Sequence, residues 1–320
     1  MQQPTSGIHH ITAIAGDPQR NIDFYAGTLG LRLVKRTVNF DDPGTYHFYY
    51  GDRTGQPGSL LTFFPWAGAF PGRVGAGQAT TVRYAVPSGS LSWWEDRLGA
   101  QGVVTVRGER FGTPYLGFAD PDGMALELVE QPGLDDLGVN PDSPIGAAQA
   151  IRRFHGTALT LRGVDATAHV VTEVLGLTLQ SVDGAVQRFA PADPALGVVD
   201  LIRSPESRGG SLGAGSVHHV AWRAADAAQQ LQLRGRVLGY PLQVTPVVDR
   251  QYFQSIYFRE PGGVLFEVAT DGPGFLIDEP VESLGQALKL PPQYEGSRAA
   301  IESLLAPVTL PGAGQTPVEA

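Results

Sequence analysis

Histidines whose spacing could support metal chemistry occur in two doublets, far apart along the chain. Four of the seven histidines form these doublets, one in GIHHITAIAGD and one in SVHHVAWRAAD. In both stretches the second histidine, His10 or His219, lies seven residues before the aspartate that ends the apolar run. Because neighbouring side chains of a strand point to opposite faces, only one histidine of each doublet can bind a metal directly. The shared spacing favours His10 and His219, and it places His9 and His218 at the cavity edge or just behind it.

Each doublet begins one copy of a unit that occurs four times in the sequence. Every copy has an apolar strand, a turn with Asp or Gly, an amphipathic helix that ends near Leu-Gly, and further strands. The four βαβββ modules are expected at residues 7–66, 79–130, 153–203 and 216–270. The glycines that follow the four helices are Gly30, Gly99, Gly176 and Gly239. The sequence therefore predicts an α+β fold built from a repeated module.

Alignment of the four modules shows which copies could share a metal site. In module order, the first-strand position holds His10, Thr81, Ala158 and His219. The matching position on the last strand holds Thr62, Glu127, Leu201 and Glu267. We expect pairs of modules to close into two curved mixed-sheet barrels, each around a cavity. Pairing of modules one and four would bring both histidines together with Glu267 and Thr62. Pairing of modules two and three would offer only Glu127, which we interpret as a solvated or salt-bridged remnant of the repeat.

Two imidazoles and one carboxylate form a donor set that suits Fe(II), with Mn(II) as an alternative, and leave positions open for substrate and O₂. A structural zinc site more often has four protein ligands, commonly including cysteine, and the chain has no cysteine. The sequence thus predicts a metal site at the two aligned histidines and Glu267. His155 is a rival ligand, but it is three residues out of register and is interpreted as structural. His47 and His169 have no comparable support.

Composition limits the classes of partner that the chain can have. The chain has 320 residues, a net charge of −9 and no cysteine. Nucleic acid is not an expected partner, because phosphate binding needs clustered Lys and Arg, and no such run is present. The longest apolar stretches, about ten residues, are too short for a membrane span, and no signal peptide is visible. We therefore expect a cytoplasmic protein without a membrane partner; association into a homo-oligomer stays open.

The modules suggest how the chain is divided. We expect an N-terminal half at residues 1–135, a turn-rich linker at 136–152 and a C-terminal half at 153–275. The remaining residues, 276–320, are expected to form a docking helix followed by a Pro/Gly-rich tail.

These features resemble the vicinal oxygen chelate superfamily, which includes glyoxalases and extradiol ring-cleaving dioxygenases. The similarity covers nearly the whole chain and is closest to the hydroquinone and chlorohydroquinone dioxygenases. The most similar stretches include HHITAIAGDPQRNIDFYAGTLGLRLVKRTVNFDD, HHVAW and DRQYFQSIYFREPGGVLFEVATDGPGF. The resemblance implies that the iron ligands are His10, His219 and Glu267.

The resemblance also implies roles for residues around the metal. The family has counterparts of His9 and His218, and of Arg250 and Tyr257 on the hairpin before the glutamate. An arginine can hold a phenolate or a peroxo oxygen, and a tyrosine hydroxyl can donate to it or pass a proton. The implied activity is an Fe(II)-dependent dioxygenase that opens a 1,4-dihydroxylated, hydroquinone-type ring with O₂. Its partners would be a small aromatic diphenol and O₂.

Two other functions stay open on the same fold. A glyoxalase-type isomerase or thiol transferase typically has a second carboxylate in the cavity, where this chain has Thr62. A protein that sequesters a small aromatic molecule often lacks the metal-binding trio, which is present here. Metal content and substrate assays distinguish these alternatives from a dioxygenase.

Overall fold

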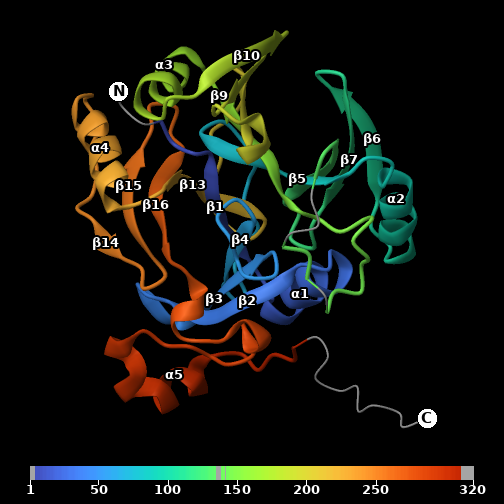
Figure 1. Ribbon diagram of the computed structural model, residues 1–320, viewed down its shortest axis with the longest axis vertical. Coiled ribbons are helices and arrows are strands. Elements are labelled where there is room, and N and C mark those ends of the chain that lie inside the picture. Colours follow the sequence, from blue (N-terminus) through green and yellow to red (C-terminus); the bar gives the residue numbers. More distant parts are fainter. Residues whose placement is uncertain (1–3, 135–137, 141, 311–320) are drawn as a thin grey trace.

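Two curved eight-stranded sheets form the centre of the protein, and helices lie on its outside (Figure 1). The computed structural model describes residues 4–134, 138–140 and 142–310. Along the chain, a strand, a helical segment and three further strands occur four times in succession. The predicted α+β fold of four βαβββ modules is therefore confirmed.

The first sheet combines modules one and four, in the order β14-β15-β16-β13-β1-β4-β3-β2. Its strands are β1 (Ile8–Ala15), β2 (Arg32–Asn39), β3 (Asp42–Gly51), β4 (Leu60–Pro65), β13 (Ser216–Ala224), β14 (Val248–Asp249), β15 (Phe253–Arg259) and β16 (Leu265–Pro273). The second sheet combines modules two and three, in the order β10-β11-β12-β9-β5-β8-β7-β6. Its strands are β5 (Gln78–Pro87), β6 (Thr105–Arg110), β7 (Thr113–Ala119), β8 (Ala125–Gln131), β9 (Arg153–Leu161), β10 (Thr178–Asp183), β11 (Val186–Ala190) and β12 (Val198–Arg203). The pairing of modules predicted from the sequence is confirmed.

Helices connect the first strand of each module to the remaining three. They are α1 (Pro18–Ile22) with a π-helical continuation at Asp23–Thr28, α2 (Leu91–Ala100), α3 (Asp165–His169) with a continuation at Val170–Val174, and α4 (Ala227–Leu238). A further helix, α5 (Arg298–Leu304), lies near the C-terminus and outside the modules. The aspartates that mark the ends of the two doublet strands are N-caps. Asp17 accepts a hydrogen bond from the backbone of Arg20, and Asp226 accepts one from the backbone of Gln229. No helix in the described part of the chain has the length and apolar character needed to cross a membrane.

The middle of the first sheet explains why the two doublets meet. β1 and β13 are antiparallel neighbours, with Thr12 opposite His219 and His10 opposite Ala221. β16 runs parallel to β13, with Glu267 beside Ala221. The three predicted ligands therefore project from three adjacent strands, although the chain separates His10 from His219 by about 200 residues.

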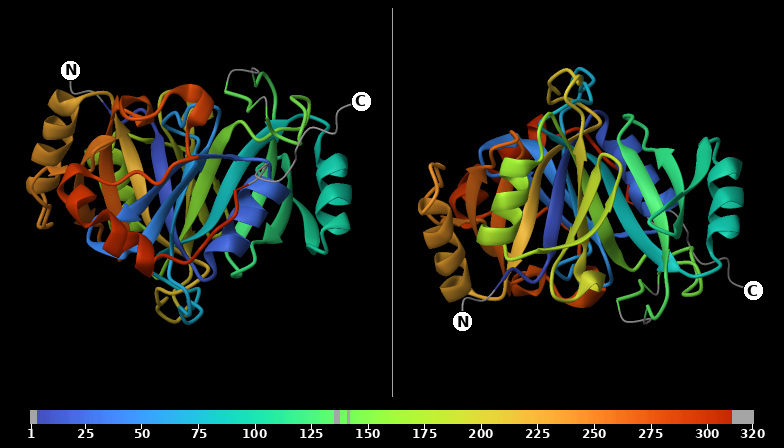
Figure 2. Two further views of the ribbon diagram at one scale, coloured as in Figure 1. Left: turned by 90° about the horizontal axis from the view of Figure 1, so that it is seen from below. Right: turned by 90° about the horizontal axis from the view of Figure 1, so that it is seen from above.

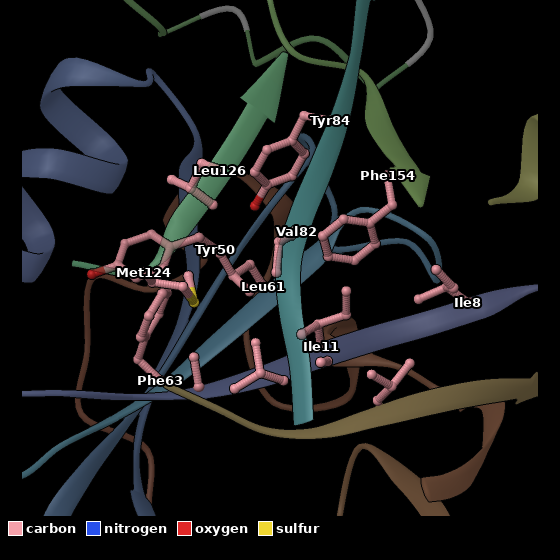
Figure 3. Close-up of a cluster of buried hydrophobic side chains, with 14 of the residues drawn as sticks. Ile8, Ile11, Tyr50, Leu61, Phe63, Val82, Tyr84, Met124, Leu126 and Phe154 are labelled. Atoms are coloured by element: carbon pink, nitrogen blue, oxygen red, sulfur yellow. The ribbon is translucent and has the colours of Figure 1, made fainter. Parts of the chain in front are cut away.

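The main hydrophobic core lies between the two sheets. Ile11 and Leu61 of the first sheet alternate with residues that face the cavity, and they share one buried cluster with Val82, Leu126 and Phe154 of the second sheet. Figure 3 shows these side chains converging from both sheets. Full burial of each such side chain favours the folded state by about 1.5–3 kcal/mol of transfer free energy. This packing fixes the strands that carry the metal-site candidates.

The C-terminal segment crosses module one and includes α5 (Figure 2). Lys35 of β2 is completely buried and forms ion pairs with Asp278 and Glu279 of this segment. Leu288 forms a β-bridge with Arg36. The predicted docking helix corresponds to α5, whereas residues 311–320 of the predicted tail lie outside the described residues. The proposed division into halves stays a prediction. Each sheet contains one module from each half.

Candidate metal centre

Side chains from β1, β13 and β16 converge at one buried point. The Nε2 atoms of His10 and His219 lie 3.3 Å apart. Glu267 Oε2 lies 3.3 Å from His10 Nε2 and 2.9 Å from His219 Nε2. The three residues are buried, and their potential ligand atoms all lie within 4.8 Å of one another. The structure thus brings together the trio that the sequence predicts, and the role of these residues as ligands stays a prediction.

The oxygen atoms of Glu267 have unequal surroundings. Oε1 accepts a hydrogen bond from Ser255 Oγ, whereas Oε2 is buried without a well-directed hydrogen bond from any described residue, although both imidazoles touch it. Burial alone would raise the pKa of Glu267, but the neighbouring imidazoles hold it well below its ordinary value. An ionised, buried oxygen that faces two imidazole nitrogens is a donor set suited to Fe(II) or Mn(II). The residues therefore fit a divalent metal.

The neighbour of His10 determines which nitrogen of His10 faces the centre. His10 Nδ1 lies 2.9 Å from His9 Nδ1, and His9 Nε2 lies 3.1 Å from the carbonyl oxygen of Thr270. Because a carbonyl only accepts, His9 carries its proton on Nε2 and accepts from His10 Nδ1–H. Burial and the nearby His10 lower the pKa of His9 to about 3, so this imidazole is neutral at pH 7. With His10 Nδ1 engaged in this way, His10 Nε2 is the nitrogen that faces the centre and can bind a metal.

The second doublet repeats this arrangement with one difference. His219 Nδ1 lies 2.8 Å from His218 Nδ1, and burial together with His219 lowers the pKa of His218 to about 3. Burial also lowers the pKa of His219. If His219 Nε2 binds a metal, its Nδ1–H donates to His218, whose own proton is then on Nε2. His218 lines the cavity, and no described residue accepts from its Nε2. His218 therefore keeps a hydrogen-bond donor for a bound molecule, whereas the donor of His9 is occupied.

Arg250 and Tyr257 lie on the β15 side of the trio. Tyr257 is opposite Glu267 in the sheet, and Arg250 Nε donates to Tyr257 Oη at 3.1 Å. Arg250 Nη1 also donates to Asp41 at 3.2 Å. Burial and Glu267 raise the pKa of Tyr257, so its phenol stays protonated. Burial opposes the charge of Arg250, but Tyr257 and nearby carboxylates raise its pKa above the ordinary value. The structure thus brings to the cavity both residues that the family resemblance pointed to, and their roles stay a prediction.

A cavity of about 370 Å³ lies over these groups, within the size range of small-molecule sites. Aromatic rings from strands and adjoining turns line it, namely Phe40, Tyr49, Phe64, Trp66 and Phe253. His47 of β3, which no sequence pattern supported as a site residue, also lines the cavity. A usable signal was present: Thr62 was already aligned with Glu267, and the strand that pairs with it carries His47 and Tyr49 on one face.

An ion network occupies the equivalent face of the second sheet. Arg83 is buried and donates to Glu127 at 2.8 Å and, through Nη1, to Asp200. Two further arginines bind the same carboxylates: Arg110 of β6 binds Glu127, and Arg188 of β11 binds Asp200. Glu127 is thus salt-bridged, in agreement with its interpretation as a remnant of the repeat. Leu201, the predicted counterpart of Glu267, packs in the core instead, and its neighbour Asp200 joins the network.

The remaining histidines lie away from the trio. His155 is on β9 of the second sheet, with Nδ1 3.5 Å from Gln131 Oε1. Burial and nearby arginines lower the pKa of His155 to about 3. His169 is exposed at the end of α3, and its ring centroid lies 5.4 Å from that of Tyr240. Neither residue is near the candidate metal centre.

Comparisons with known proteins agree with this arrangement. A family model described as Glyoxalase/Bleomycin resistance protein/Dioxygenase superfamily matches residues 7–128. A Bacillus subtilis (strain 168) protein assigned as ring-cleaving dioxygenase MhqO is 48% identical over 307 residues, covering 96% of this chain and 98% of the relative. The chlorohydroquinone/hydroquinone 1,2-dioxygenase of Sphingobium indicum is 41% identical over 310 residues, covering 92% of this chain and 95% of the relative.

A solved structure shows the same agreement in three dimensions. The crystal structure of a Bacillus subtilis protein assigned as a dioxygenase superposes with a TM-score of 0.93 at 47% sequence identity. The match covers 96% of this chain and 99% of the crystallised one. Similarity in sequence and in structure therefore extends over nearly the whole chain.

Proposed function

We propose that this chain, which belongs to the glyoxalase/bleomycin resistance protein/dioxygenase superfamily, is an Fe(II)-dependent dioxygenase that opens a hydroquinone-type ring with O₂. One observation carries the proposal: two imidazole nitrogens and Oε2 of Glu267 meet at a buried point beneath an aromatic-lined cavity. The names of the full-length relatives support ring cleavage as the reaction and a 1,4-dihydroxylated aromatic as the substrate class.

The metal would be held by His10, His219 and Glu267. Fe(II), when bound, supplies the redox chemistry by which O₂ reacts with a phenolic ring. Mn(II) accepts the same donor types and is the second candidate. Three protein ligands, rather than the four that are usual in structural zinc sites, favour a catalytic role.

Arg250 and Tyr257 would bind a hydroxyl oxygen of the substrate. Arg250 keeps a positive charge at the cavity wall, and this charge favours the phenolate form of a nearby hydroxyl. Tyr257 Oη accepts from Arg250, so its own proton can be donated to a substrate oxygen. Together they would lower the cost of removing a proton from the diphenol before the ring reacts.

His218 and His9 would have different roles. The neutral His218 presents Nε2–H to the cavity, where it can hold a substrate oxygen or transfer a proton to it. His9 does not line the cavity, and its Nε2 proton is bound to the Thr270 carbonyl. We therefore assign His218 to direct contact with substrate, and His9 to the orientation of His10.

The glyoxalase-type alternative has less support from this site. Its second carboxylate would be expected at Thr62, whose hydroxyl is instead hydrogen-bonded to Thr12 and His47. A cytoplasmic location and association of identical chains stay predictions from the sequence.

Oxygen uptake tests the proposal. Protein purified and loaded with Fe(II) without air should consume O₂ when hydroquinone is added. Uptake with neither hydroquinones nor catechols would refute a ring-cleaving dioxygenase. Activity with Ni or Zn on a glutathione adduct would indicate the isomerase instead. Failure to bind any metal stoichiometrically would indicate a sequestering protein.

A further inference from the structure

A continuous chain of hydrogen bonds lines the cavity wall on the β3–β4 side. Tyr49 Oη lies 2.9 Å from His47 Nδ1, and His47 Nε2 lies 2.9 Å from Thr62 Oγ1. Thr62 Oγ1 in turn lies 2.8 Å from Thr12 Oγ1. We call these four residues the hydroxyl chain. Both of its ends, Thr12 and Tyr49, line the cavity, and neither end has another side-chain hydrogen-bond partner among the described residues.

The hydroxyl chain is the counterpart, in module one, of the metal-binding side of module four. Thr62 of β4 lies opposite Tyr49 of β3, just as Glu267 of β16 lies opposite Tyr257 of β15. The two tyrosines therefore occupy equivalent positions on the two sides of one cavity. Threonine replaces the carboxylate, so the first module presents a neutral hydroxyl where the fourth presents a negative charge.

The residues that support these two positions are also equivalent. Ser255 lies two residues before Tyr257 and donates to Glu267. His47 lies two residues before Tyr49 and contacts Thr62 through Nε2. In module four, Ser255 supports the negative charge of Glu267, which suits a cation. In module one, His47 and Thr62 are both neutral. The wall of module one is therefore suited to a neutral hydrogen-bonding group.

The number of protons carried by the hydroxyl chain determines which ligand group this wall can bind. Burial lowers the pKa of His47 well below its ordinary value, so the imidazole has one donor and one acceptor nitrogen. The arrangement that uses every internal donor then has all hydrogen bonds pointing the same way along the chain. With either direction, one terminal hydroxyl keeps a free proton and the other terminal oxygen keeps a free lone pair. A hydroxyl that can both donate and accept satisfies either state.

We propose that the hydroxyl chain binds the second hydroxyl of a para-diphenol and that His47 determines specificity for it. This inference rests on the proposed function, in which the first hydroxyl is held near the metal and Arg250. The His47 ring is fixed between Tyr49 and Phe64, with ring centroids 4.1 Å and 4.4 Å away, so its nitrogens cannot turn to other partners. An apolar substituent at the second position would leave a donor in the cavity unpaired.

Binding without turnover measures this preference. Calorimetry on the Fe(II)-loaded protein, without air, would compare hydroquinone with 4-methylphenol, which lacks the second hydroxyl. The wild-type protein should bind hydroquinone about tenfold or more tightly. His47→Phe keeps an aromatic ring but removes both nitrogens, and should reduce this ratio to about one. His169→Asn, on the exposed end of α3, is the matched control and should keep the wild-type ratio.

A second variant keeps the test informative if His47→Phe does not fold. Thr62→Val is nearly isosteric and interrupts the hydroxyl chain at its centre, so it should also abolish the preference. An unchanged ratio in a folded variant of either residue, or no preference in the wild-type protein, would overturn the inference. Preference for hydroquinone without O₂ uptake would refute the proposed function but leave the hydroxyl site intact. Uptake with an unchanged ratio in the variants would refute the hydroxyl site alone.

Discussion

Replacement of Ser255 by alanine should weaken metal binding without touching a ligand atom. Ser255 is completely buried on β15, and its Oγ donates to Oε1 of Glu267. No other described side chain donates a hydrogen bond to Oε1, whereas Oε2 faces the two imidazoles. Loss of this bond would leave the carboxylate free to rotate away from the position that suits a metal.

The size of the effect follows from the part that this serine plays. Removal of a hydrogen-bond partner behind a metal ligand typically costs 10- to 100-fold in affinity, or about 1.4–2.8 kcal/mol. The serine hydroxyl is small, so the cavity left by Ser255→Ala adds little strain. We therefore expect about a tenfold to hundredfold weaker binding of Fe(II), with a nearly unchanged fold.

Competition with a chelator under anaerobic conditions would measure the affinity, and circular dichroism would confirm folding. Ser90→Ala is a matched control, because Ser90 is also buried but lies before α2, beside the second sheet. The control should bind Fe(II) as the wild-type protein does. Equal affinity in Ser255→Ala and wild type would refute the assignment of Ser255 and, with it, the idea that Oε1 must be held for Oε2 to bind.

Three further variants test the ionisable groups outside the metal centre. Arg83→Met should lower the free energy of unfolding in urea by about 3 kcal/mol, because two buried carboxylates lose their shared partner. This value is the low end of the usual range, since each carboxylate keeps a second arginine partner. An almost unchanged free energy of unfolding would contradict the stabilising role of Arg83. His155→Asn should make stability less dependent on pH, because the folded pKa of about 3 lies below the unfolded value. A lowered pKa gives stability that is complete above about pH 6.5 and is lost as the pH falls toward 3, so at pH 5 the wild-type protein should have lost about 2 kcal/mol more than the variant. Equal losses of stability in the two proteins would show that His155 is protonated as readily in the folded state as in the unfolded state. Lys35→Met should cost about 3 kcal/mol and expose the C-terminal segment to proteases, since its two carboxylate partners lie there. Unchanged proteolysis would mean that other contacts hold the segment.

The sequence was sufficient to predict the fold and to bring the three candidate metal ligands together. A module that occurs four times has an internal register, so a histidine in the first copy could be matched with one in the last copy. Pairing of these two copies then places His10, His219 and Glu267 on adjacent strands of one sheet. Local alternation, which is a property of any strand, also separated each ligand candidate from its neighbour in the doublet.

Other features could not be found by searching for repeated histidines. His47 has no counterpart of its own type, because module four has Ser255 at the equivalent position. The substitution of a carboxylate–serine pair by a threonine–histidine pair becomes visible only when strand pairing is known. In the second sheet the alignment missed the role of Asp200 by one residue, which is enough to reverse the face of a strand.

Metal analysis of protein purified without air tests the central claim most directly. The wild-type protein should retain about one Fe(II) per chain. His10→Ala, His219→Ala and Glu267→Ala should each abolish retention, whereas His155→Ala should leave it unchanged. Stoichiometric iron in all three trio variants, or loss of iron only in His155→Ala, would contradict the assignment of the metal centre to the cavity shared by modules one and four.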